Sequence, residues 1–257
     1  MTKNVTFILL TALSLAFRKP NSQVKDADPA KPTIVLVHGL WADGSSWSKV
    51  IPLLTQKGYN VISVQNPTTS IEDDVVATKR AIELAKGDVV LVGHSWGGFV
   101  ITEAGDNPKV KCLVYVNAYA PEKGETVPTL SAKAVPTKLS DFLVPLNGFI
   151  SLTEEGVKNA FANDLPEGEQ KLIFTVQQPA SVNVFKAVGN NAAWKSKPSW
   201  YIISSEDKTI SPELERFMAD RAKSKTTVLK ANHVSMLSKP NEVVAVIEDA
   251  ATQSSQH

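Results

Sequence analysis

The stretch DVVLVGHSWGG, residues 88–98, decides the fold of this chain. Its four apolar residues, Val89 to Val92, are followed at once by a glycine, which is typical of a strand buried on both faces. The pattern Gly-x-Ser-x-Gly comes next, with Ser95 at its centre. A serine in a tight turn from strand to helix has a strained backbone, so Gly93 and Gly97 leave room where side chains would not fit. The stretch therefore predicts a nucleophilic serine held above the end of a central strand.

Strand and helix patterns alternate on both sides of this stretch. Buried-strand patterns occupy residues 33–37, 60–64, 89–92, 110–116, 200–203 and 227–229. Helical patterns cover residues 45–57, 70–86 and 96–104, a segment that begins at Ser211-Pro212, and residues 241–250. This alternation predicts an α/β fold with a parallel sheet, right-handed crossovers and a functional site at the carboxyl ends of the strands.

The alternation is interrupted over residues 118–197, where no clear buried strand is visible. Helical patterns occur instead near residues 153–163, 167–177 and 180–188. A disordered linker is disfavoured, because apolar residues such as Phe142 and Phe161 need to be buried. An insertion of this size between two strands predicts a helical lid over the strand ends.

A serine hydroxyl is a poor nucleophile at neutral pH, so it needs a nearby base that a third group orients. The chain has four histidines. His94 adjoins Ser95 and cannot fold back onto it, His38 follows the first strand, and His257 ends a polar tail. His233 follows the strand pattern 227–229 and precedes the last helix, which makes it the predicted base.

Two carboxylates compete for the role of the orienting acid. Glu206 and Asp207 both follow the strand pattern that ends at Ile203. Asp207 is favoured, because its shorter side chain fixes an imidazole more tightly and because the loop turns there towards the next helix. Glu206 stays open as a substitute. If neither acts as the acid, both are solvated loop charges or a helix cap.

An oxyanion needs two donors, and the predicted turn supplies one from the backbone N–H of Trp96. The Leu40 N–H, after His38-Gly39, is predicted to supply the other. His38 and Trp41 are candidate pocket residues, and Trp47 fits either the pocket or the core. No glycine-rich phosphate loop and no metal-ligand spacing is found, so we expect no cofactor and no metal. Three further acids, Asp43, Asp73 and Asp74, are interpreted as a turn residue and helix-face charges.

The length, charge and cysteine content of the chain exclude several classes of protein. The chain has 257 residues, enough for one domain with an insertion. Its net charge is +1 and its basic residues are dispersed, so no nucleic acid partner is expected. The single cysteine, Cys112, lies in an apolar run and is expected in the core.

The first 31 residues differ from the rest. Lys3 precedes an apolar segment, residues 5–17, which is too short to cross a bilayer as a helix but matches a signal-peptide core. We therefore expect a signal peptide and linker over residues 1–31, followed by one domain over residues 32–257. This favours a secreted or periplasmic protein without a stable membrane anchor. A cytoplasmic protein is the alternative.

Four motifs resemble the α/β-hydrolases, and among them the small-lid group of carboxylesterases and hydroxynitrile lyases. The motifs are PTIVLVHGLWADGSSW, VVLVGHSWGGFVI, SSEDKTISPELERFMADR and ANHVSMLSKPNEV. This resemblance covers residues 32–250. It implies a mostly six-stranded parallel sheet flanked by helices, a helical lid and no cofactor. It also implies that Ser95, His233 and Asp207 act as nucleophile, base and acid.

The resemblance also bears on the reaction. The lyases of the group have a threonine where this chain has Gly39, and a lysine where it has Val234. Trp96 is similar to the tryptophan of haloalkane dehalogenases, but those enzymes use an aspartate nucleophile. We therefore expect a serine hydrolase that cleaves small or medium carboxylic esters through an acyl-enzyme, with a homodimer left open. The alternatives are a hydroxynitrile-lyase-type carbon–carbon lyase and a ligand-binding protein with marginal turnover.

Overall fold

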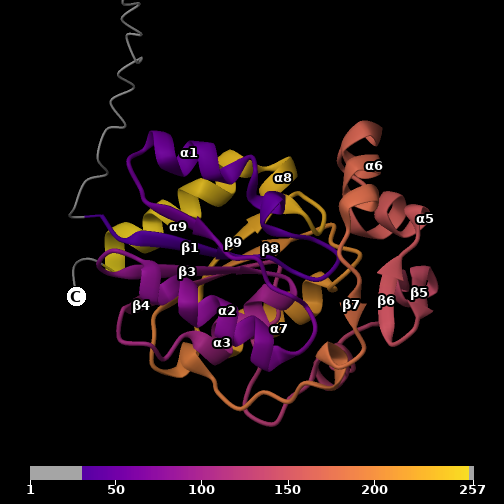
Figure 1. Ribbon diagram of the computed structural model, residues 1–257, viewed down its shortest axis with the longest axis horizontal. Helices are drawn as coiled ribbons and strands as arrows, with labels where there is room; N and C mark the ends of the chain where they lie inside the picture. The colour runs from indigo at the N-terminus through magenta and orange to yellow at the C-terminus, as the bar shows by residue number, and fades with distance from the viewer. Residues whose placement is uncertain (1–30, 255–257) are drawn as a thin grey trace, which may run out of the picture.

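The computed structural model describes residues 31–254. Six parallel strands form one sheet in the order β2-β1-β3-β4-β8-β9 (Figure 1). The strands are β1 (Thr33–Val37), β2 (Val61–Ser63), β3 (Val89–His94), β4 (Val110–Val116), β8 (Ser199–Ser204) and β9 (Lys225–Leu229). The predicted α/β fold and parallel sheet are confirmed. The predicted signal peptide lies outside the described residues.

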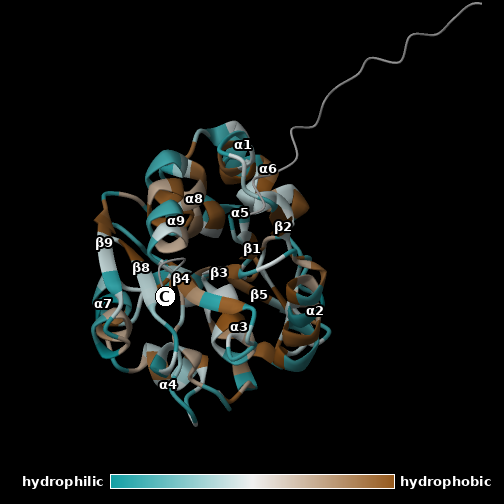
Figure 2. Ribbon diagram, turned by 90° about the vertical axis from the view of Figure 1, so that its left-hand side faces the viewer, coloured by the Kyte–Doolittle hydropathy of each residue, from teal (hydrophilic) through white to brown (hydrophobic). Residues whose placement is uncertain are grey.

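Helices cover both faces of the sheet, which explains the continuous apolar runs in its central strands. Figure 1 shows α1 (Val50–Gln56) and α9 (Pro240–Ser254) on one face, with α2 (Ile71–Leu84), α3 (Trp96–Ala104) and α7 (Pro212–Arg221) on the other. Every residue of β3 is buried, and the hydrophobic colour of Figure 2 is strong there. Among residues 31–254, no helix has both the length and the apolar character that a membrane crossing requires.

Local sequence signals set several helix ends. Ser70 caps α2 by accepting the Asp73 amide at 3.1 Å, and Ser211 caps α7 by accepting the Leu214 amide at 3.2 Å. The predicted helix over residues 45–57 is split into a 3-10 turn, η1 (Gly44–Trp47), and the short helix α1. A further short helix, α8 (Ser235–Ser238), precedes α9.

The insertion, residues 117–198, connects β4 to β8 and contains both helices and strands. Its helical elements are α4 (Val127–Ser131), η2 (Lys138–Phe142), α5 (Glu154–Gly156), η3 (Val157–Phe161), α6 (Glu167–Val176), η4 (Val184–Lys186) and η5 (Ala193–Lys195). Its strands β5 (Leu143–Leu146), β6 (Phe149–Leu152) and β7 (Ala180–Ser181) form an antiparallel sheet. The predicted helix over 167–177 is confirmed, whereas the one over 180–188 is wrong, because its first residues pair with β6.

The insertion lies beside the carboxyl ends of the main strands (Figure 1). The Ser181 amide donates to the Thr68 carbonyl after β2 at 2.9 Å, and Asn232, after β9, donates its amide to Asp164 at 3.0 Å. These bonds join the insertion to the loop after β2 and to the loop that carries His233.

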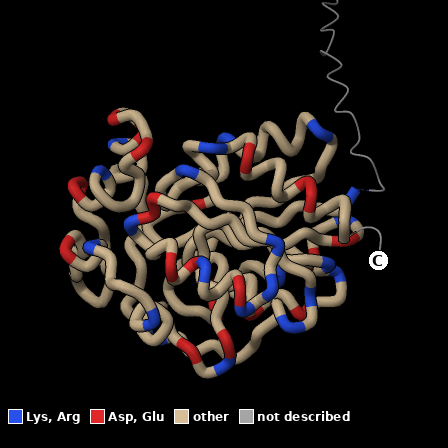
Figure 3. Tube along the Cα trace, turned by 180° about the vertical axis from the view of Figure 1, so that it is seen from behind, with Lys and Arg blue, Asp and Glu red and all other residues tan. Residues whose placement is uncertain are grey.

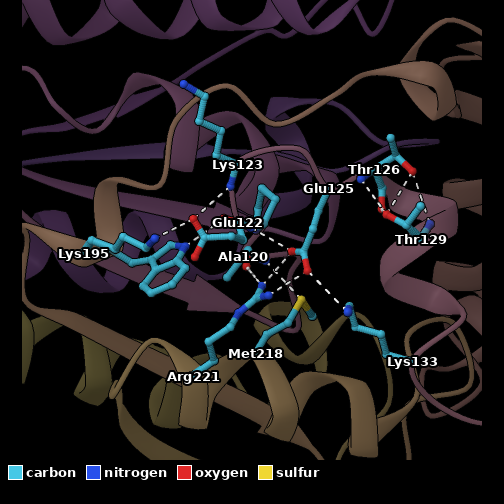
Figure 4. A network of polar contacts seen from close by, with 12 residues as sticks. Ala120, Glu122, Lys123, Glu125, Thr126, Thr129, Lys133, Lys195, Met218 and Arg221 are labelled. Atoms are coloured by element: carbon cyan, nitrogen blue, oxygen red, sulfur yellow. Dashed lines mark hydrogen bonds and ion pairs between the residues drawn. The ribbon is translucent and has the colours of Figure 1, made fainter.

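A network of polar contacts fixes the beginning of the insertion to α7 (Figure 4). The Arg221 guanidinium donates to both carboxylate oxygens of Glu125, at 2.8 and 2.9 Å, and to the Ala120 carbonyl at 2.8 Å. A bidentate pair of this kind holds a defined geometry. Elsewhere on the molecule, basic and acidic residues alternate along the trace without a region of a single sign (Figure 3).

Candidate active site

Ser95 stands in the turn between β3 and α3 with a strained backbone, φ 54° and ψ −121°. Hydrogen bonds maintain this conformation. The Ser95 amide donates to the Val116 carbonyl at 3.2 Å, and the Ser95 carbonyl accepts the amides of Gly98 and Tyr119 at 3.0 and 3.1 Å. The turn therefore has the strained geometry that the sequence pattern predicts.

Glycines permit the close backbone approach around Ser95. A side chain at Gly93 would collide with the Gly97 carbonyl, and one at Gly97 would collide with the Val37 carbonyl. A β-carbon at Gly39 would lie 2.7 Å from the β-carbon of Ser95. The loop after β1 consequently lies directly against the turn that carries the serine.

His233 and Asp207 form a fully buried pair. Their Nδ1 and Oδ2 atoms are 2.7 Å apart. The other carboxylate oxygen of Asp207 accepts the amides of Thr209 and Ile210 at 2.6 and 2.9 Å. The Asp207 carboxylate can only accept here, so Nδ1 of His233 carries a proton, and in the neutral imidazole Nε2 then keeps its lone pair. Nε2 has no hydrogen-bond partner among residues 31–254, which leaves it available as a base.

Glu206, the competing acid, faces away from this pair. Its side chain is 47% exposed and lies 3.8 Å from the ammonium group of Lys230. The structure thus brings Asp207, and not its neighbour, to the imidazole of His233.

His94 precedes Ser95 in the chain and packs against His233. Its ring centroid is 4.7 Å from that of His233, and its Nε2–H donates to the His233 carbonyl at 3.0 Å. Burial and the nearby His233 ring hold the pKa of His94 well below its usual range. No hydrogen bond joins the Ser95 hydroxyl to His233 within the described residues. Bonds of this kind are often long in an empty site and tighten when a substrate binds.

The backbone amides of Leu40 and Trp96, the predicted oxyanion donors, lie next to Ser95 in the chain or against it in the fold. The Leu40 amide follows Gly39 in the loop against Ser95, and no acceptor for it is found among residues 31–254. Trp96 is the first residue of α3, so its amide has no acceptor within the helix. These are the two donors that the sequence predicts.

A cavity of about 390 Å³ opens beside these residues. Its walls are largely apolar and include Trp41, Phe161, Leu172, Ile173, Val176, Val234, Met236 and Leu237. Its lining includes His94 and Val234, the chain neighbours of Ser95 and His233, and the Phe161 ring lies 5.2 Å from the ring of His233. Lys49 and Glu169, also in its lining, form an ion pair at 2.6 Å between the main domain and the insertion.

Comparison with known proteins decides the family. The model of the alpha/beta hydrolase family matches residues 34–246. The chain belongs to the alpha/beta hydrolase family. It is similar to a carbendazim hydrolyzing esterase of Nocardioides sp., at 35% identity over 122 residues that span 41% of this chain and 50% of that protein.

Two further similarities cover most of this alpha/beta hydrolase. An alpha-hydroxynitrile lyase of Arabidopsis thaliana is 28% identical over 86% of this chain and 98% of that protein. The solved structure of a pyrethroid hydrolase from Sphingobium faniae is 24% identical, with a TM-score of 0.74 over 88% of this chain and 99% of that one. The structural likeness at this low identity shows the shared fold.

His38 and Trp47 of this hydrolase are packed in the interior and do not face the cavity. The His38 ring is fully buried; its Nδ1–H donates to the Gly39 carbonyl at 2.8 Å, and its Nε2 accepts the Asn66 amide at 2.9 Å. Neither ring nitrogen is left for a substrate, and burial lowers the pKa of His38. Trp47 is also fully buried, whereas Trp41 lines the cavity as predicted.

Sequence reasoning missed two buried acids of this hydrolase. Asp74, interpreted as a helix-face charge, is fully buried, so that interpretation is wrong. It accepts the indole N–H of Trp96 at 2.7 Å, and burial raises its pKa to about 6. Glu215 is buried next to Asp207 and accepts the Ser204 amide at 2.9 Å. Burial and the Asp207 carboxylate raise the pKa of Glu215 well above its usual range.

Two further features concern the potential metal ligands and the single cysteine. Among residues 31–254, no cluster of three or more histidine, cysteine or carboxylate side chains is arranged to hold a metal ion. Cys112 is buried in the core as expected, and burial raises the pKa of its thiol to about 12.

Proposed function

We propose that this chain is a serine hydrolase that cleaves small or medium carboxylic esters through an acyl-enzyme. The observation that carries the proposal is the buried Asp207–His233 pair, which leaves the Nε2 lone pair of His233 free next to the strained turn of Ser95. The similarity to an esterase supports it.

The proposed reaction begins with proton transfer. His233 Nε2 accepts the Ser95 proton while the serine oxygen attacks the ester carbonyl, and the amides of Leu40 and Trp96 donate to the oxyanion. The buried Asp207 carboxylate stabilises the imidazolium that forms. The imidazolium then protonates the leaving alkoxide, which departs as the alcohol. Water, deprotonated in turn by His233, attacks the acyl-enzyme and releases the carboxylic acid and the free serine.

The cavity supports an uncharged substrate. Its volume of about 390 Å³ falls within the range of small-molecule pockets, about 300–1,000 Å³. Aromatic and aliphatic side chains form most of its walls, and the charges of Lys49 and Glu169 neutralise each other. We therefore infer that apolar acyl or aryl groups bind there.

A carbon–carbon lyase is the second candidate, because the chain is similar to a hydroxynitrile lyase over most of its length. Two features favour the esterase. Gly39 lies so close to Ser95 that a threonine side chain would not fit without movement, and Val234 is a buried apolar residue of the cavity. Release of cyanide from mandelonitrile at a rate above that of ester cleavage would favour the lyase.

Hydrolysis of p-nitrophenyl acetate and butyrate tests the proposal. Ser95→Ala is expected to lower turnover by about four to six orders of magnitude. Ser238→Ala removes a buried hydroxyl without a hydrogen-bond partner in the described part of the chain, so it serves as a matched control with parent-like turnover. Equal rates for Ser95→Ala and the parent, at equal melting temperature, would reject the proposed function. A single slow burst by the parent would indicate a binding protein.

A further inference from the structure

The side chain of Trp96, the residue after Ser95, is held in a fixed position by its neighbours. Trp96 is almost fully buried, and its indole N–H donates to the Oδ2 atom of Asp74 at 2.7 Å. Its ring also stacks on Phe99, with centroids 4.9 Å apart. The indole N–H is thus used in a bond to α2 and is not available to a substrate. The backbone amide of Trp96, by contrast, is the proposed oxyanion donor.

Asp74 makes a second bond on its other side. Its Oδ1 atom accepts the Thr68 amide at 2.8 Å, and Thr68 has a left-handed backbone, φ 53°. The same Thr68 carbonyl accepts the amide of Ser181 in β7 at 2.9 Å. The carboxylate therefore joins α3 to the loop after β2, which is hydrogen-bonded to the insertion.

The charge of this carboxylate has no cationic partner. The groups that contact Asp74 from other elements, the Trp96 indole and the Thr68 amide, are neutral. On its own helix the charge that acts on it is Asp73, which is exposed and bonded to Thr69 and Ser70. Burying a carboxylate without a cation is unfavourable, and here the two buried donors that it pairs offset this cost. The acid is therefore needed for the position of these two donors.

We propose that Asp74 is a positioning residue: by holding the indole of Trp96 it keeps the Trp96 amide aimed at the oxyanion. The inference rests on the proposed function. Two bonds at 2.7 and 2.8 Å require two acceptor atoms on one rigid group, which a carboxylate supplies and an amide does not. If the first residue of α3 shifted, the Trp96 amide would no longer point at the oxyanion. This would weaken its hydrogen bond in the transition state, where the negative charge develops, and would change substrate binding in the ground state little.

The test compares Asp74→Asn with Asp73→Asn, which removes the same charge one residue away and is expected to keep parent kinetics. Loss of one oxyanion donor lowers kcat by about 10²–10³, so a misplaced donor in Asp74→Asn should lower kcat by about 10- to 100-fold. KM is expected to stay within about threefold, since the ground state makes little use of this donor. Binding of a trifluoromethyl ketone, which forms an oxyanion on Ser95, should weaken by the same factor as kcat.

Two further readouts separate positioning from folding. Asp74 in the parent takes up a proton near pH 6, so the ratio of parent kcat to Asp74→Asn kcat should shrink as the pH falls from 7.5 to 5. Trp96→Phe keeps an aromatic ring, although a smaller one, and removes the indole N–H, so it should lower kcat similarly, and the double variant should lower it no further. If Asp74→Asn does not fold, Trp96→Phe carries the test.

The results that would overturn the positioning role of Asp74 differ from those that would overturn the proposed esterase function. An active parent that Ser95→Ala inactivates, together with parent-like kcat in Asp74→Asn or Trp96→Phe, would overturn the positioning role alone. A rise in KM without a change in kcat, or additive effects in the double variant, would also overturn it. A parent without esterase activity would overturn both inferences.

Discussion

The rings of His94 and His233 pack at an angle of 51° with centroids 4.7 Å apart, and the Nε2–H of His94 donates to the His233 backbone carbonyl at 3.0 Å. His94, the residue before Ser95, thus holds the backbone of His233. Because β3 and the loop after β9 are far apart in the sequence, this contact fixes how the two halves of the site meet.

Replacing His94 by phenylalanine tests this contact. The ring is kept, but the buried His233 carbonyl loses its donor, which should lower the free energy of unfolding by about 1–3 kcal/mol. We also expect kcat to fall about tenfold or more, because the imidazole of His233 loses part of its support. Urea unfolding and ester kinetics check both effects. Unchanged stability and turnover would show that the bond contributes nothing.

Asp207 and Glu206 should differ sharply on substitution. Asp207→Asn keeps the shape of the side chain but favours the wrong tautomer of His233, so kcat should fall by about 10⁴. Glu206→Gln alters an exposed side chain near Lys230, and its kcat should stay within about twofold of the parent. Similar losses in the two variants would contradict the assignment of the acid.

Glu215 should make stability depend on pH. Its folded-state pKa is raised above the unfolded value by burial and by Asp207, so its contribution is fully present below the unfolded pKa. As the pH rises, the unfolded chain releases this proton while the folded protein retains it, so stability falls until the pH passes the folded pKa.

Glu215→Gln removes this titration and keeps the size of the side chain. Its urea midpoint relative to that of the parent is therefore expected to increase between pH 5 and pH 8. A constant difference between the two midpoints over this range would show that Glu215 is not protonated in the folded protein.

The ion pair of Lys49 and Glu169 should influence the entry of substrate into the cavity more than the stability of the fold. Both side chains are more than a third exposed, and such pairs contribute about 0–1 kcal/mol. Because they join the main domain to α6 at the cavity, Glu169→Ala should raise kcat/KM for p-nitrophenyl octanoate relative to acetate by about three- to tenfold. The melting temperature should change little. An unchanged preference for chain length would separate the pair from substrate entry.

The sequence predicted the main sheet because its strands are buried on both faces and read as continuous apolar runs. It did not predict β5 and β6, because Pro145 and Ser151 interrupt their apolar residues and leave only short runs. Val144, Leu146 and Phe149 are moreover exposed, so these strands are not buried on both faces. The signal that identifies them is Asn147-Gly148, with φ of 50° and 81°, a pair typical of a tight hairpin. The helix expected over residues 180–188 fails because pairing of β7 with β6 overrides local preference.

In the candidate site, too, some residues could be predicted from the sequence and others could not. Ser95, His233 and Asp207 follow strands and could be predicted from order along the chain. Asp74 was misread because charge was taken as a sign of exposure, although it lies on the buried stripe of α2 with Ile71, Thr78 and Ile82. The burial of Glu215 depends on contacts with β8 and Asp207 that only the folded chain creates.

Labelling with a fluorophosphonate tests the central claim most directly, because only an activated serine reacts with this reagent quickly and in a 1:1 ratio. Peptide mass spectrometry should find one phosphonylated residue, Ser95, and the adduct should disappear in His233→Ala while a folded melting transition remains. The absence of an adduct, or an adduct on another residue with Ser95 unmodified, would contradict the account.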